Sequence, residues 1–127
     1  MQWFTRLFNF LGVESQLLQW VPAFTGLTVV NGTGAATYTG TYTKIGRIVF
    51  WTVVITVTGS CTTASVLNTT FVNNLPFTVG VNSTCHVINA VGLAIGVGQV
   101  PASGVAAYPP AWSAYNGAVT VSGWYSI

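Results

Sequence analysis

The sequence predicts an all-β protein, an antiparallel β-sandwich preceded by a short apolar arm. From Pro22 onward the chain is rich in Thr, Val and Gly. Thr and Val suit a pleated strand far better than a helix. The whole chain holds 14 glycines and five prolines, and their short spacing is typical of strands joined by turns. A length of 127 residues fits one domain of this kind.

The first 20 residues differ from the rest and are expected to form an anchor arm, with the sandwich over residues 21–127. Five large apolar side chains have the i, i+3, i+4, i+7 spacing of an amphipathic helix: Trp3, Phe4, Leu7, Phe8 and Leu11. The segment lacks the features of a signal peptide, and it is too short and interrupted to span a bilayer. We expect it to dock on a partner protein, in helical or extended form. Two alternatives stay open, an arm that caps the domain's own core and a helix on a membrane surface.

Alternating apolar residues and turn residues together predict eight strands. They cover residues 24–30, 36–43, 47–58, 69–72, 77–81, 85–91, 93–97 and 118–126. Turns are expected at Asn31-Gly32, Gly59-Ser60, Asn73-Asn74 and Asn116-Gly117. Residues 98–114 contain three prolines and are expected to form a long loop with at most one short strand.

The strand over residues 36–43 shows how its two faces are used. From Thr37 every second residue is Thr, and the residues between are Tyr38, Gly40 and Tyr42. Successive side chains of a strand point to opposite faces. We therefore expect the tyrosines to face the core and a row of hydroxyl groups to face outward.

The strand over residues 48–58 is apolar on both faces. One face is plainly core and carries Val49, Trp51, Val53, Ile55 and Val57. The other face sets Ile48, Phe50 and Val54 among threonines, although a solvated face of an antiparallel sheet should be polar. We infer that part of this second face is covered, either by the arm or by a neighbouring subunit. The length of the strand favours an oligomer.

Charged residues are scarce. Arg6, Glu14, Lys44 and Arg47 are the four charged side chains, 3% of the chain, whereas an average soluble domain has about 25%. Net charge keeps proteins apart in solution. We therefore expect the chain to be embedded in a membrane, a symmetric oligomer or a large assembly. A lipid-facing barrel is disfavoured because the outward row of residues 36–43 is Thr rather than apolar.

The same scarcity argues against catalysis. The chain lacks Asp altogether, so it has neither two side-chain carboxylates for glycoside hydrolysis nor a Ser-His-Asp triad. Three basic residues cannot form a surface that follows a phosphate backbone. We expect no enzyme activity, no cofactor, no metal and no nucleic-acid partner. Cys61 and Cys85 are expected to be free buried thiols, with a bridge between strands as the alternative, and His86 is expected to be structural.

Two runs of sequence resemble a known class of protein. They are Trp20-x-Pro22-x-Phe24-x-Gly26-Leu27 and Tyr38-Thr-Gly-Thr-Tyr42-Thr-Lys44-Ile45-Gly46-Arg47-x-Val49. Together with the later Asn73-Asn74-Leu75-Pro76-Phe77 they resemble the C-terminal β-domains of phage tail fibres and small virion proteins of tailed phages. The resemblance implies a sandwich of jelly-roll type, commonly a homotrimer, used for decoration or host attachment. With only about 20 residues ahead of the sandwich, we expect a small head-fibre or decoration protein docked on capsid or tail proteins.

Two groups of residues are candidates for ligand binding. Lys44 and Arg47 flank a predicted turn, where they would hold an acidic group of a partner or an anionic glycan, or simply solubilise the turn. The aromatic residues of the long loop are Tyr108, Trp112 and Tyr115. These rings would stack on a host surface glycan, as in a carbohydrate-binding module of a tail fibre, or would pin the loop over the core.

Overall fold

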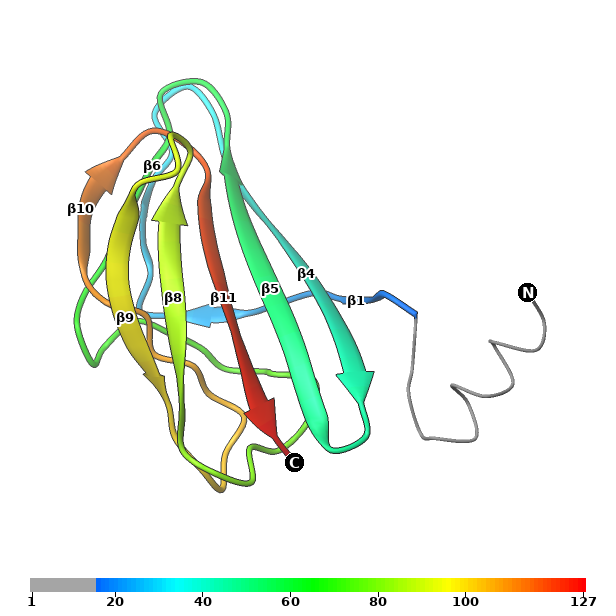
Figure 1. The fold of residues 1–127 in the computed structure, drawn as a ribbon. Helices are drawn as coiled ribbons and strands as arrows, with labels where there is room; N and C mark the ends of the chain where they lie inside the picture. The colour runs from blue at the N-terminus through cyan, green and yellow to red at the C-terminus, as the bar shows by residue number, and fades with distance from the viewer. Residues whose placement is uncertain (1–15) are drawn as a thin grey trace.

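The computed structural model describes residues 16–127, and this part of the chain is all-β, without a helix. Its strands are β1 (Leu18–Trp20), β2 (Phe24–Thr25), β3 (Thr28–Val30), β4 (Ala36–Ile45), β5 (Ile48–Val57), β6 (Thr62–Ser65), β7 (Phe71–Val72), β8 (Ser83–Asn89), β9 (Ala94–Val100), β10 (Trp112–Tyr115) and β11 (Val119–Ser126). They form the predicted antiparallel sandwich (Figure 1).

A six-stranded sheet dominates the structure, with the strand order β1-β4-β5-β11-β8-β9. In Figure 1 its long strands β4, β5, β11, β8 and β9 run side by side. The other sheets are smaller, a three-stranded sheet β10-β6-β3 and a two-stranded sheet β2-β7. Among the sheets of residues 16–127, only the large one is broad enough to offer an extended face.

The hairpin of β4 and β5 forms the longest ladder, with the pairing running from Ala36↔Val57 to Ile45↔Ile48. A two-residue loop joins the strands, and its first residue, Gly46, has φ +59°. A tight hairpin loop needs a positive φ at this position, which glycine adopts without strain. The turn fixes the register, and the register places the two faces of β5 as the alternation predicts.

The core lies against the inner face of the large sheet. Four of the five expected core side chains of β5 are buried, namely Val49, Trp51, Val53 and Ile55. β11 and β8 add further buried side chains, which are Val119, Val121, Tyr125, Cys85 and Val87. Tyr38 and Tyr42 of β4 pack on this cluster, while the alternating threonines face outward. The expected faces of both strands are therefore confirmed.

The expected strand over residues 77–81 is wrong. The amide of Val79 donates to the carbonyl oxygen of Gly104 at 2.8 Å, and the amide of Gly80 donates to that of Ser126 at 2.6 Å. The amide of Phe77 donates to the hydroxyl oxygen of Tyr125 at 3.1 Å. Because these donors are used by a loop, a strand end and a side chain, the segment joins no ladder.

Other boundaries also differ from the sequence expectation. The expected strand 24–30 is split into β2 and β3 at Gly26, which has φ +72°. The sheet begins at Leu18, three residues before the expected start of the sandwich, and β6 lies where no strand was expected. The long loop is shorter than expected, because β9 continues to Val100 and β10 begins at Trp112.

Candidate docking face on the six-stranded sheet

The side of the six-stranded sheet that points away from the core is named the outer face here. Strand pairing lines up its side chains in rows that cross the sheet. The central row consists of Thr41, Thr52, Ser122, His86 and Val97, on β4, β5, β11, β8 and β9 in that order. Side chains on neighbouring strands of one face are in contact distance. The row therefore forms a continuous polar stripe that ends in an apolar residue.

Large apolar side chains lie on both sides of this stripe. On one side, Phe50 of β5 pairs with Trp124 of β11. Phe50 is 47% exposed and Trp124 is 54% exposed, although both lie on inner strands of the sheet. On the other side, Val54 pairs with Thr120, which in turn pairs with the exposed Ile88. The outer face of β5 is thus about half apolar, as expected for residues 48–58.

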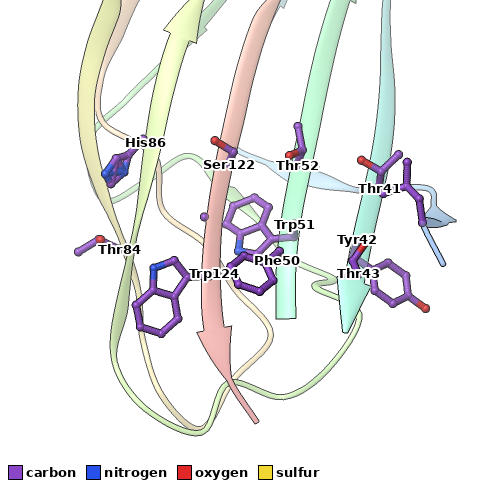
Figure 2. A pocket seen from close by; sticks show the side chains of 12 residues that line it. Thr41, Tyr42, Thr43, Phe50, Trp51, Thr52, Thr84, His86, Ser122 and Trp124 are labelled. Carbon is purple, nitrogen blue, oxygen red and sulfur yellow. The ribbon is translucent and has the colours of Figure 1, made fainter. Parts of the chain in front are cut away.

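A groove of about 550 Å³ lies on this face (Figure 2). Phe50 and Trp124 lie next to each other at one end, and Ser122, Thr52 and Thr41 lie in line across the strands. Leu17, the residue just before β1, also lines the groove. The chain therefore enters the sandwich at the rim of the outer face. The expected docking residues Trp3, Phe4, Leu7, Phe8 and Leu11 lie outside the described residues.

No charged side chain of residues 16–127 lines the groove. Lys44 and Arg47 are the two charged residues between positions 16 and 127, and neither lines it. Its polar groups are the hydroxyls of Thr41, Thr52, Ser122 and other Ser or Thr residues, with the imidazole of His86. Hydroxyl groups both donate and accept hydrogen bonds. The face therefore suits an uncharged partner with apolar surface and hydroxyl or backbone polar groups.

Lys44 and Arg47 contact other parts of their own chain. The ammonium nitrogen of Lys44 lies 5.8 Å from the centre of the Phe77 ring, within the range of a cation–π contact. The guanidinium of Arg47 donates to the oxygen of Ile127 at 3.1 Å, and the amide of Ile127 donates to the carbonyl oxygen of Arg47 at 2.8 Å. Both contacts give these residues a structural use, and an acidic partner for them stays a prediction.

The three aromatic residues of the long loop do not form a common exposed platform. Trp112 is only 8% exposed, and its indole nitrogen donates to the carbonyl oxygen of Thr63 at 3.2 Å. The ring centre of Tyr108 lies 4.9 Å from that of Phe71. Tyr115 packs on the core cluster. These contacts support the alternative, a loop pinned by its rings, and they correct the expectation of a stacking site centred on Trp112.

The sequence reasoning missed Trp124 as a candidate. Its signal was the alternation of β11, in which Val119, Val121 and Tyr125 point into the core. Trp124 must then point outward, because successive residues alternate. The sequence pattern places Phe50 on the outward face correctly. It does not predict that Trp124 is its neighbour, because that depends on the pairing of β5 with β11.

Cys61 and Cys85 are free and buried, as expected. Burial raises the pKa of the Cys85 thiol to about 11, against a smaller opposing effect of a backbone hydrogen bond with Gly98. The thiol is therefore protonated at neutral pH, and its Sγ donates to the carbonyl oxygen of Tyr108 at 3.7 Å. A buried, protonated thiol is a poor nucleophile, so Cys85 serves to pack β8 against the loop.

Between residues 16 and 127 no helix has the length and apolar character needed to cross a membrane. Within the same range, no three side chains of His, Cys, Asp or Glu gather into a metal-binding group. Comparison with protein-family models, curated proteins and solved structures finds no match to the chain. The candidate site therefore rests on the geometry of the outer face.

Proposed function

We propose that the chain is a non-enzymatic structural protein of a tailed-phage virion, a head-fibre or decoration protein on the capsid or tail surface. One observation carries the proposal. Residues 16–127 hold two charged side chains and, among themselves, leave exposed a broad, partly apolar sheet face that carries the rings of Phe50 and Trp124. Contiguous apolar patches on a soluble domain mark interaction sites. The runs around Trp20 and Tyr38 resemble those of phage virion proteins, and for this reason we propose a virion as the assembly.

In this proposal the protein works by binding alone. The arm of residues 1–20 docks on capsid or tail proteins, and the sandwiches join as a homotrimer. Covering roughly 400 Å² of apolar surface per chain, about half of an 800 Å² interface, would contribute about 10 kcal/mol of gross hydrophobic free energy, which is of the same order as the cost of association. The threonine-covered surfaces that remain open then face solvent and contribute to host attachment.

A second candidate is a carbohydrate-binding module that recognises a host surface glycan. The observation that favours it is the exposed ring pair of Phe50 and Trp124 beside the hydroxyls of Ser122 and Thr52. Aromatic rings can stack on the apolar faces of sugars, and hydroxyls can bond to theirs. It ranks second because, in the part of the chain that the structure describes, no carboxylate, carboxamide or guanidinium side chain lines the groove to hold a sugar hydroxyl in a fixed direction.

The virion role predicts that the protein travels with the particle. Particles should be purified by density gradient from a phage or prophage that carries the gene and analysed by quantitative mass spectrometry. We expect this chain in a fixed ratio to the major capsid or tail protein. Particles from a strain in which the gene is deleted are the control. A protein that is abundant in the lysate but absent from purified particles would contradict the proposal.

A further inference from the structure

We infer that the outer face of the six-stranded sheet is buried against neighbouring copies of the same chain, with Phe50 and Trp124 as its main apolar contacts. The inference rests on the proposed function for the existence of an assembly. It adds the surface through which the assembly forms and the side chains that carry it.

The position of the apolar residues carries the first step. Phe50 and Trp124 lie on β5 and β11, the third and fourth strands of the six-stranded order, and not at an edge. Large aromatic residues at the centre of a contact, ringed by weaker ones, are typical of the residues that dominate binding. Here the ring consists of Thr43, Thr52, Ser122 and Thr84, which line the same groove.

The size of the face is the second step. Five of the six strands have seven to ten residues and β1 has three. With a rise of about 3.3 Å per residue and a spacing of about 4.8 Å between strands, they cover roughly 700 Å² in projection. The accessible surface of such a corrugated face is larger than its projection. A stable interface buries about 800 Å² of accessible surface per partner. The outer face therefore has the area of a complete interface.

The scarcity of charged groups favours a second copy of the same chain as the partner. An interface with another protein would normally desolvate some charged groups, whereas no charged side chain between positions 16 and 127 lines the groove to pair with them. A second copy brings an equally uncharged surface, since the whole chain has four charged residues. Its hydroxyl rows are both donors and acceptors, so Thr and Ser rows can satisfy one another across the contact.

The place where the arm joins the sheet fits the same arrangement. Leu17 lines the groove, so copies that meet through the outer face bring the starting points of their arms close together. Several linked arms bind a surface more tightly than one, because each later binding event becomes intramolecular. Assembly and anchoring would thus reinforce each other.

Hydroxyl-radical footprinting of the intact wild-type protein tests the inference directly. After each rate is divided by the intrinsic reactivity of its side chain, we expect Phe50 and Trp124 to be oxidised several-fold more slowly than Leu67, which is exposed to a similar degree in the single chain. A charge placed at the centre of the face should reverse this protection. Thr52→Asp puts a short carboxylate there, with Thr41 and Ser122 as its neighbours across the strands. We expect it to weaken association at least about a hundredfold, because an unpaired charge would be buried.

Thr62→Asp is the matched control. Thr62 is a half-buried threonine on β6, the middle strand of the three-stranded sheet. We expect this variant to keep the wild-type mass in light scattering and the wild-type protection of Trp124. Circular dichroism of both variants checks that they fold. If Thr52→Asp does not fold, the footprint of the wild-type protein alone tests the inference.

The remaining outcomes separate this inference from the proposed function. An assembly in which Phe50 and Trp124 are as reactive as Leu67, each relative to the intrinsic reactivity of its side chain, would overturn the inference but leave an assembling virion protein. A monomer at every concentration would overturn both. Protection that is lost in Phe4→Ser/Phe8→Ser, in a protein of single-chain mass, would show that the chain's own arm covers the face. Protection that appears only with a neutral oligosaccharide would show a glycan site.

Discussion

Trp51→Ala is expected to lower the free energy of unfolding by about 3–5 kcal/mol, the range for truncating a large aromatic residue in a core. Trp51 lies near the middle of β5 and is 2% exposed. It belongs to the core cluster formed by the inner sides of β5, β11 and β8. Total stabilities of domains are about 5–15 kcal/mol, so the loss is a large share of the whole. Urea unfolding followed by circular dichroism measures it.

Trp124→Ala is the matched control for this prediction. Trp124 sits on the opposite side of the same sheet, and its neighbour Gly123 pairs with Trp51. Because Trp124 is half-exposed in the single chain, we expect its loss to cost less than about 1 kcal/mol of that chain's stability. Both tryptophans should be measured in the Thr52→Asp background, so that assembly does not contribute. Equal losses at the two positions would mean that the core and outer faces are not as described.

Gly98→Ala is expected to cost about 3 kcal/mol, the upper part of the range for overpacking a close-packed site. A Cβ at Gly98 would overlap the carbonyl oxygen of Tyr108 and would lie 2.7 Å from the Cα of Pro109 and 2.9 Å from the Sγ of Cys85. Next to it, Gln99 and Tyr108 exchange two backbone hydrogen bonds of 2.8 and 2.7 Å. The substitution would push the loop away from β9 and expose Cys85. Thermal unfolding and the rate of Cys85 alkylation report these two effects.

Gly104→Ala separates this steric effect from a general cost of replacing glycine. Gly104 lies in the loop between β9 and β10, its φ lies outside the left-handed region, and a Cβ there meets nothing within 4 Å. We expect no loss of stability, or a gain of up to about 1 kcal/mol from the less flexible unfolded chain. A loss as large as that of Gly98→Ala would contradict the assignment of the close contact.

Local patterns in the sequence were sufficient for the parts of the fold that depend on local rules. The alternation of Thr37 to Thr43 and of Val49 to Ile55 predicts both faces of β4 and β5, because side chains in a strand alternate whatever the strand pairs with. Gly46 predicts a tight turn for the same local reason. The antiparallel sandwich follows from several such strands separated by turn residues.

Patterns that depend on distant partners were missed. Phe77, Val79 and Val81 alternate like a strand, but the amides of this segment are bonded to a loop, to Tyr125 and to the end of β11. β6 has the sequence Thr-Thr-Ala-Ser, with no large apolar residue to mark it. Its residues Thr63 and Ser65 are buried. Trp112 of β10 pairs with Ser65, and its indole nitrogen donates to the carbonyl oxygen of Thr63. The sequence pattern contains no trace of that contact.

The candidate site likewise has one part that local sequence patterns predict and another that depends on distant residues. The apolar outer face of β5 was visible in the sequence, and it led to the expectation of a covered surface. The pairing of Phe50 with Trp124 was not visible, because it needs the long-range ladder between β5 and β11. For the same reason, the sequence pattern does not decide whether the loop aromatics around Trp112 are exposed or pin the loop over the core. Jelly-roll type, trimer symmetry and virion location stay predictions.

The central claim is that assembly is the normal state of this protein, and sedimentation equilibrium of the purified full chain on serial dilution tests it most directly. We predict a species of three times the 13.4 kDa mass of one chain, stable on dilution into the nanomolar range. The mass should change little with salt, because the proposed contact has no ion pairs. A soluble single chain of 13.4 kDa at every concentration would contradict the account.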